Sequence, residues 1–271
     1  MRSFSRPPRP SLRPFVESLW AFDSSGAPAG EGPRERVLPT GLTHLVIRLS
    51  ADPLRIFAGP TTETSTTFEH GVVGGARSAA YVRDASAPSR SVGAQLLPGA
   101  ARLLFGGPAS ELGERHTSLG DLWGRGATEL RDRLGETGSL EDAVAALESE
   151  LAARMPKVRG IHPAIAGALD ELARGARIGD VVDAAGLAHA RFIALFRRDV
   201  GLAPKQHCRV LRFQRARVAL DDPGASIADV AALAGFADQA HLTREFGAIA
   251  GITPGEYRAI GPASNHVPIK R

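Results

Sequence analysis

The stretch from Ile178 to Tyr257 contains nearly the same pattern twice, about fifty residues apart. The first copy reads IGDVVDAAGLAHARFIALFRRDVGLAPKQH, and the second reads IADVAALAGFADQAHLTREFGAIAGITPGEY. Each copy predicts a short helix with apolar residues at helical spacing, a glycine-centred turn, and a second amphipathic helix containing phenylalanine. Two helices joined by a tight turn with glycine form a helix-turn-helix unit. The sequence therefore predicts two such units, over about residues 178–199 and 227–249.

The second copy has complete signals for both of its helices. Ser226 and Asp229 form a capping box, which satisfies the free N–H groups at the start of a helix. Gly235 stands where this helix must end, and Asp238 is a suitable N-cap for the next one. In the first turns of that second helix, polar side chains lie on the face opposite the apolar stripe. A recognition helix reaches base edges in the major groove with residues of these turns. Its expected base contacts are Gln239, Ala240, Thr243 and Arg244.

The first copy has weaker signals. Its second helix is expected from about His189 to Asp199, and only Ala188 or His189 is available as a cap. The side chains expected to face a groove discriminate bases poorly, so the second copy is expected to be the better sequence reader. The expected base contacts of this copy are His189, Ala190, Arg191 and Ala194, and the expected phosphate contacts of the whole region are Arg197, Arg198, Arg209 and Arg212.

The C-terminal hundred residues resemble the DNA-binding domain of the AraC/XylS family of transcription regulators. The resemblance is carried by IADVAALAGF-ADQAHLTREF-GAIAGITPGEYR and by GLAPKQHCRVLRFQRARVAL. It implies an all-α domain over residues 157–271, in which a long linker helix at 204–221 joins the two units. It also implies that the two recognition helices enter successive major grooves of double-stranded DNA.

The charge of the chain is divided unevenly. Residues 1–155 hold 17 arginines against 18 acidic residues, a net charge of −1, whereas residues 156–271 hold 16 basic against 11 acidic residues, a net of +5. The positive excess thus belongs to the part that is expected to contact phosphates. Because this excess is modest, binding is expected to depend on where individual arginines lie.

The sequence shows no motif for catalysis, a metal or a cofactor. Cys208 is the single cysteine, which excludes an intrachain disulfide and gives no zinc-ligand cluster. His44, His70 and His116 are isolated from one another in the sequence, unlike the His-x-His pair of a metal-binding cupin. No phosphate loop or nucleophile motif is present. With no signal peptide and no long apolar run, the chain is expected to be a cytoplasmic, non-enzymatic protein without a membrane span.

The N-terminal half, residues 1–156, shows short strand patterns followed by helical ones. Strands are expected at 42–49, 55–57, 79–83 and 91–97, and this spacing favours a small β-sandwich or barrel. Helices are expected at 99–105, 108–112, 127–134 and 140–155, and Lys157–Gly160 is the expected linker between two domains. The chain is therefore expected to be an α+β protein of two domains, a β-sandwich or barrel with trailing helices and an all-α domain.

The N-terminal half also resembles, less specifically, the cupin-like sensory domains that precede many AraC-type DNA-binding domains. The resemblance lies in VGAQLLPGAARLLFGGPASEL and LGDLWG. It implies a transcription regulator, such as an activator that works with RNA polymerase, under the control of a small-molecule effector, of homodimer formation, or of both. The helix 140–155 is a candidate for pairing with a second copy. Two alternatives remain open, namely a DNA-binding domain fused to an enzymatic N-terminal domain or to an architectural one.

Overall fold

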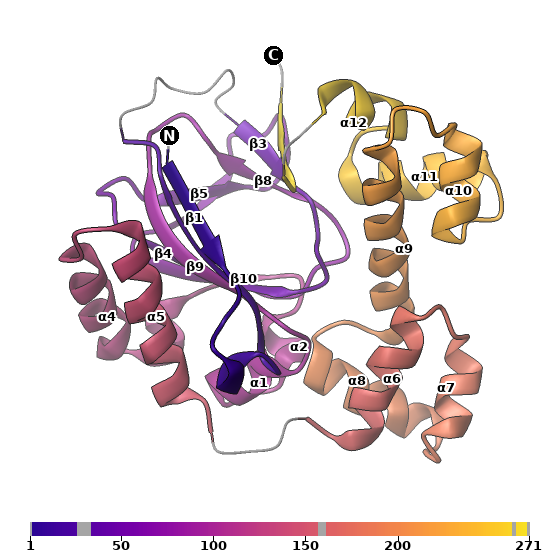
Figure 1. Ribbon diagram of the computed structural model, residues 1–271, viewed down its shortest axis with the longest axis horizontal. Helices are drawn as coiled ribbons and strands as arrows, with labels where there is room; N and C mark the ends of the chain where they lie inside the picture. The colour runs from indigo at the N-terminus through magenta and orange to yellow at the C-terminus, as the bar shows by residue number, and fades with distance from the viewer. Residues whose placement is uncertain (1, 26–33, 157–160, 262–263, 270–271) are drawn as a thin grey trace.

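The structure is a computed structural model that describes residues 2–25, 34–156, 161–261 and 264–269. Its N-terminal domain is rich in β-strands and its C-terminal domain is helical (Figure 1). The expected linker Lys157–Gly160 lies outside the described residues. No helix in the described ranges is long and apolar enough to cross a membrane.

The described strands form two antiparallel sheets. One sheet has six strands in the order β1-β2-β9-β4-β7-β10, and the other has five in the order β11-β3-β8-β5-β6. The bounds are β1 Arg2–Arg6, β2 Val16–Asp23, β3 Arg34–Val37, β4 Thr43–Arg48, β5 Leu54–Phe57, β6 Ser65–Phe68, β7 Gly71–Gly74, β8 Tyr81–Asp84, β9 Arg90–Leu96, β10 His116–Ser118 and β11 His266–Pro268. The sequence predicts a small β-sandwich or barrel, and the two sheets confirm a β-rich domain of this kind. The four expected strands correspond to β4, β5, β8 and β9.

The larger apolar core of the N-terminal domain lies outside the sandwich, between the six-stranded sheet and the helices that follow it. Leu45 and Ile47 of β4 are fully buried on that side, together with Leu147 and Leu151 of the covering helix. The short 3-10 helix Pro10–Leu12 belongs to the same side. The helices are α1 Ala100–Phe105, α2 Ala109–Leu112, α3 Leu119–Trp123, α4 Arg125–Gly135 and α5 Leu140–Arg154. The apolar cluster between the two sheets is much smaller and is built around Leu54, Ile56 and Val72.

Helix α5 corresponds to the helix that the sequence predicts at 140–155. Its apolar residues pack against β2 and β9 of the same chain. Leu147 and Leu151 are 0% exposed. The amphipathic pattern was read correctly as a helix. Pairing of this helix with a second copy stays a prediction, which its covered apolar face does not support.

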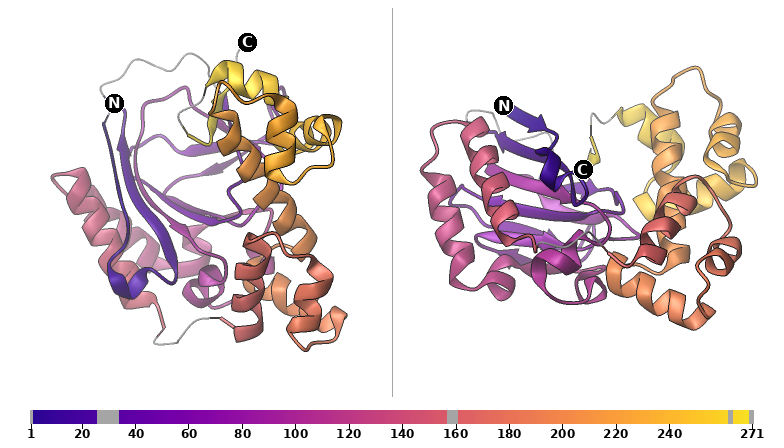
Figure 2. Two further views of the ribbon diagram at one scale, coloured as in Figure 1. Left: turned by 45° about the vertical axis from the view of Figure 1, so that its right-hand side comes forward. Right: turned by 60° about the horizontal axis from the view of Figure 1, so that its bottom comes forward.

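The C-terminal domain is arranged around one long helix. Helix α9 runs between the two helix-turn-helix units, as the two rotated views also show (Figure 2). Phe192 and Phe196 centre the core of the first unit, and Phe213 and Phe246 lie in the core of the second. The helices are α6 Pro163–Ala173, α7 Ile178–Ala184, α8 His189–Val200, α9 Pro204–Leu220, α10 Ile227–Ala234, α11 Gln239–Ala250 and α12 Pro254–Ile260.

The local signals of the second copy are confirmed. The Ser226 hydroxyl accepts a hydrogen bond from the Asp229 N–H at 3.1 Å, and the Asp229 carboxylate accepts one from the Ser226 N–H. Gly235 ends α10 with a φ of 81°, which a residue with a Cβ adopts at a cost. The Asp238 carboxylate caps α11 by accepting from the His241 N–H at 2.6 Å. Helix α8 has no side-chain cap at Ala188, as expected.

The two domains are joined by contacts that no sequence pattern indicated. Strand β11, near the C-terminus, pairs with β3 and becomes an edge of the five-stranded sheet. Val267 of β11 and Leu38, just after β3, are buried in the same cluster as Phe213 and Phe246. The second helix-turn-helix unit is therefore packed against the N-terminal domain as well as against α9.

Candidate DNA-binding surface and N-terminal pocket

Helix α11 presents its expected reading face to solvent. Gln239, Ala240 and Arg244 are exposed, whereas Thr243 is half-buried. The Thr243 hydroxyl donates a hydrogen bond to the Gln239 carbonyl oxygen at 2.9 Å, within the helix. Among the described residues, no element covers Gln239 and Arg244, the two long side chains with bidentate hydrogen-bonding capacity.

Helix α8 presents its expected reading face in the same way. His189, Ala190, Arg191 and Ala194 are all exposed, and Phe192 and Phe196 on the other side are fully buried. Burial of the phenylalanines fixes which face of the helix points outward. The outward face offers two polar side chains and two methyl groups.

The arginines that were expected to contact phosphates have different surroundings. Arg197 is exposed at the end of α8. Arg198 donates to the buried Asp199 carboxylate at 2.8 Å, and Arg209 of α9 pairs with Glu245 of α11 at 2.5 Å. The guanidinium of Arg212 lies 5.8 Å from the Phe236 ring centre. Of these four side chains, Arg197 is the one that no carboxylate or ring engages in the described structure.

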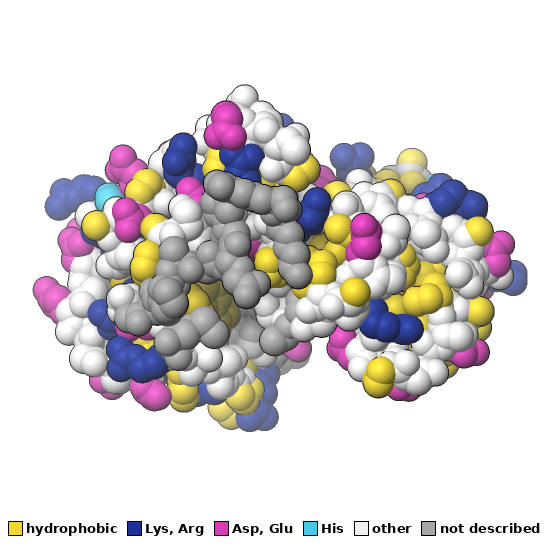
Figure 3. All heavy atoms as spheres, turned by 90° about the horizontal axis from the view of Figure 1, so that it is seen from above, with side chains coloured by type: hydrophobic (Ala, Val, Ile, Leu, Met, Phe, Trp, Pro, Cys, Tyr) yellow, Lys and Arg dark blue, Asp and Glu magenta, His cyan; other side chains and the backbone are white. Residues whose placement is uncertain are grey.

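Lysine and arginine side chains are not concentrated on the face seen from above. They are scattered among acidic and neutral side chains over both domains (Figure 3). This face thus carries no broad patch of positive charge.

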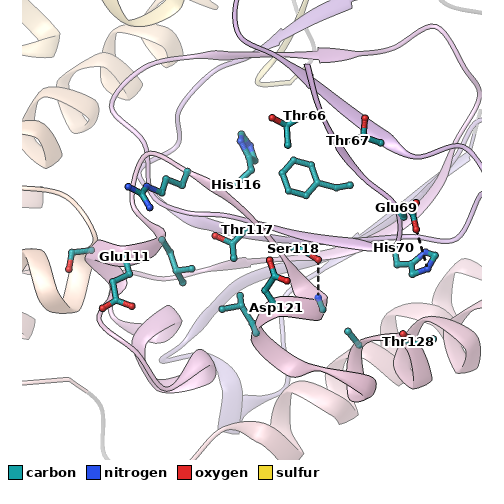
Figure 4. A pocket seen from close by; sticks show the side chains of 17 residues that line it. Thr66, Thr67, Glu69, His70, Glu111, His116, Thr117, Ser118, Asp121 and Thr128 are labelled. Atoms are coloured by element: carbon teal, nitrogen blue, oxygen red, sulfur yellow. Dashed lines mark hydrogen bonds and ion pairs between the residues drawn. The ribbon is translucent and has the colours of Figure 1, made fainter. Parts of the chain in front are cut away.

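The N-terminal domain contains a pocket between the edge strands β6 and β10. Its volume is about 1100 Å³, and α2, α3 and α4 close its sides (Figure 4). Phe68 of β6 and His116 of β10 both line it, and Phe68 also packs against the small apolar cluster between the sheets. The lining also includes the hydroxyls of Thr66, Thr67, Ser110, Thr117, Ser118 and Thr128, and the carboxylates of Glu69, Glu111 and Asp121.

Two of the histidines that are isolated in the sequence become neighbours on the inner face of the six-stranded sheet. Gly74 of β7 pairs with His44 of β4 on one side and with His116 of β10 on the other. Burial lowers the pKa of His44 to about 4, and burial together with the charge of Arg77 lowers the pKa of His116 to about 3. Both rings are therefore neutral at pH 7.

His44 and His116 were not identified as site residues from the sequence, because their spacing gives no sign of contact. His44 Nε2 lies 2.7 Å from the Thr40 hydroxyl, and His70 is another residue that lines the pocket. Within the described ranges, no group of three or more histidine, cysteine or acidic side chains is arranged to hold a metal ion. Only the register in which the strands pair shows that His44 and His116 lie on either side of Gly74.

Comparisons with known proteins agree with a division into two domains. Residues 181–260 match the family described as "Helix-turn-helix domain", and residues 5–118 match the family described as "Domain of unknown function (DUF6597)". No curated protein matches the chain.

Among solved structures, the chain is similar to ToxT from Vibrio cholerae, with 10% identity over 96% of this chain and 98% of that one and a TM-score of 0.46. It is also similar to a transcriptional regulator of Chromobacterium violaceum with an AraC-type DNA-binding domain, with 23% identity, 37% and 94% coverage and a TM-score of 0.34. A third similar structure is the xylose-binding transcription activator XylR, with 18% identity, 45% and 39% coverage and a TM-score of 0.32.

Proposed function

We propose that this chain, whose residues 181–260 match a helix-turn-helix domain family, is an AraC-type regulator that controls transcription by reading one DNA site with two helices. In this proposal α8 and α11 enter successive major grooves, which lie roughly 34 Å apart along the duplex. The observation that carries the proposal is that both helices turn their phenylalanines inward and leave the opposite face exposed. Helix α9 lies between the two units and sets their separation.

The two helices would contribute unequally. Arg244 and Gln239 of α11 are suited to bidentate hydrogen bonds with guanine and adenine edges. The exposed face of α8 has His189 and Arg191 as its polar members, so we propose that this helix adds binding strength more than sequence choice. The remaining base contacts in the proposal are Ala190, Ala194, Ala240 and Thr243.

Phosphate contacts would fix the register of the protein on the duplex. Arg197 is the best placed of the four expected residues, since it is exposed and free of an ion pair among the described residues. Arg198 and Arg209 would have to exchange a carboxylate partner for a phosphate, and Arg212 would have to leave its place beside Phe236.

The N-terminal domain would control the position of the two helix-turn-helix units relative to the DNA. We propose a domain boundary between residues 156 and 157, a small-molecule effector in the N-terminal domain, and assembly with a second copy of the chain. The pocket between β6 and β10 has the size and the mixture of apolar and polar groups that small-ligand sites use. RNA polymerase is the further partner proposed for such a regulator, and the cytoplasm is its proposed location.

Selection of bound sequences from a random DNA pool, with the full chain, tests this function. We expect an enriched sequence with two conserved segments whose centres lie about 10 base pairs apart, one for each groove. Enrichment of no sequence, or of one segment alone, would contradict reading by two helices. The same selection with Arg244→Ala should lose the conserved bases of one segment and keep the other.

A further inference from the structure

The N-terminal domain contacts the C-terminal end of both recognition helices. At the end of α8, Gly113 of the N-terminal domain lies so close that a Cβ on it would be 2.2 Å from the Gly201 carbonyl oxygen. Near the end of α11, the Ile249 carbonyl oxygen accepts a hydrogen bond from the Ala80 N–H at 2.7 Å. Both helices carry their expected reading residues toward the opposite end, so these contacts do not cover the reading faces.

Helix α9 packs differently into the two units. Three of its residues are buried in the core of the second unit, namely Phe213, Ala216 and Leu220. Among the described residues, the buried members of the core of the first unit all come from α6, α7 and α8, and α9 adds the partly buried Cys208 and Leu211. The His207 ring of α9 also packs 5.6 Å from the Phe196 ring. The first unit is therefore held to α9 by less apolar burial than the second.

Ala76, which follows β7, fills the junction between the first unit and α9. It is buried together with Leu202, which follows α8, and with Val210 of α9. Arg102 of α1 lies 3.4 Å from the buried Asp199 carboxylate of α8. The angle between the first unit and α9 therefore depends on side chains of the N-terminal domain.

The second unit is fastened to the same domain by strand β11. This strand runs antiparallel beside β3, and the Ile269 N–H donates a hydrogen bond to the Arg34 carbonyl oxygen at 3.0 Å (Figure 1). His266 Nδ1 lies 2.7 Å from the Glu35 carboxylate. Val267 between them is buried in the core of the second unit. Strand β11 thus belongs to a sheet of one domain and to the core of the other.

We infer that the N-terminal domain is a second spacer beside α9, which fixes the separation of α8 and α11 and so selects the spacing between the two segments of the DNA site. The inference rests on the proposed function, because it concerns a site that both helices read. Helix α9 has 17 residues and is about 25 Å long, whereas successive major grooves lie about 34 Å apart. The separation therefore depends on the angle of each unit to α9, and the N-terminal contacts hold both angles.

A fixed separation makes binding sensitive to the length of DNA between the two segments. One added base pair moves a segment about 3.4 Å along the duplex and turns it by about 35°. Two rigidly held helices cannot both follow this change, so one of them loses its base contacts. Two helices with a looser mounting follow the change at a smaller cost.

Two variants loosen the mounting at different places. Gly113→Ala inserts a Cβ against the backbone of Gly201, and the φ of −55° at Gly113 suits alanine, so the strain comes from this contact alone. Gly135→Ala in α4 is the matched control, because a Cβ there has no described atom within 4 Å. A shortened chain that ends at Gly261 lacks β11 and loosens the second unit.

The first measurement needs no DNA. Spin labels at Ala184→Cys in α7 and Ala232→Cys in α10, both exposed positions, report the distance between the units in a Cys208→Ser background. By pulsed electron paramagnetic resonance we expect one narrow distance distribution in the parent and in Gly135→Ala. We expect a displaced or broader distribution in Gly113→Ala and in the shortened chain. Equal distributions in all four proteins overturn the inference.

The second measurement uses the selected two-segment DNA site, in its original form and with one base pair inserted between the segments. We expect the parent and the Gly135→Ala control to bind the original form about tenfold more tightly or better, because lost base contacts cost about 1–3 kcal/mol for each base pair. This ratio should fall about threefold or more in both loosened variants. DNA with the α11 segment alone should bind equally to all four proteins, which shows that the variants are folded.

The same measurements separate the inference from the proposed function. If a two-segment site is selected and the ratio is the same in all four proteins, the function stands and the inference is wrong. If no two-segment site is selected, the proposed function fails, and the role in spacing fails with it. A lower ratio in both loosened variants, with the control unchanged, supports the second spacer.

Discussion

Gly201 and Gly251 end α8 and α11 in the same left-handed conformation, and both lie against the N-terminal domain. Their φ angles are 92° and 70°. A Cβ on Gly113 would lie 2.2 Å from the Gly201 carbonyl oxygen, and a Cβ on Gly251 would lie 3.2 Å from Arg36 Nε. The two repeats therefore use the same corner to contact the N-terminal domain, so the relative position of α8 and α11 depends on that domain as well as on α9.

Arg244→Ala should reduce affinity for the selected DNA site by about 1–3 kcal/mol and change affinity for random DNA little. The reason is that a bidentate contact with a base edge is lost while phosphate contacts remain. Competition binding with both DNAs measures this, with Ala194→Ser on α8 as a control of small expected effect. An equal loss on both DNAs would identify Arg244 as a phosphate contact.

A fragment of residues 157–271 should fold and bind DNA, and its affinity should fall steeply with salt because arginine contacts displace counterions. It should also be less stable than the same region in the full chain, because Leu38 and β3 no longer cover its core. Circular dichroism and salt titration of DNA binding check both statements. A folded fragment without salt-sensitive binding would remove the basis of the DNA-binding assignment.

Asp199→Ala should destabilise the protein by about 1.5–3 kcal/mol, the range of hydrogen bonds that involve a charged group. Asp199 is 0% exposed and accepts from Arg198, and Arg102 of α1 lies 3.4 Å away. Arg102→Ala should cost less than about 1 kcal/mol, since this side chain is partly exposed and Arg198 remains. Urea unfolding of both variants gives the comparison, and a larger loss for Arg102→Ala would contradict it.

The parent protein should lose stability as the pH falls from 7 to 5, and His207→Leu should lose less. Burial lowers the pKa of His207 to about 4 from an ordinary value of 6.5. Between these values the unfolded chain binds more protons than the folded one, so acidification favours unfolding. The expected excess loss in the parent at pH 5 is about 2 kcal/mol, at about 1.4 kcal/mol for each pH unit below 6.5. Parallel curves of unfolding free energy against pH would show that His207 does not titrate in this way.

Val267→Ala should destabilise the full chain by about 2 kcal/mol, through lost burial and the cavity that remains. Val267 is 0% exposed in the cluster that joins β11 to the second helix-turn-helix unit. Leu233→Ala removes a larger side chain that is 72% exposed and should change stability by less than about 0.5 kcal/mol. Chemical denaturation measures the unfolding free energy of the two variants and shows whether the loss follows the burial or the size of the side chain. Equal losses would mean that packing of β11 adds little to stability.

The sequence by itself determined the helix-turn-helix units, because their signals are local. Capping by Ser226 and Asp238 and the turn at Gly235 each depend on residues within one or two helical turns. The first copy lacks a side-chain cap at Ala188, and the long helix from Pro204 was implied by the family resemblance rather than by such local signals. The two copies are offset by 49 or 50 residues, so the same pattern predicts a second helix-turn-helix unit further along the chain.

Only the tertiary structure decided how the parts meet. The pairing of β11 with β3, the covering of the six-stranded sheet by α5, and the placement of His44 and His116 on either side of Gly74 all involve residues far apart in the sequence. Local spacing carries no information on such contacts, because strand order and register are set by which apolar faces bury one another. The exposed faces of α8 and α11 could thus be predicted, whereas the pocket between β6 and β10 exists only once the strands have paired.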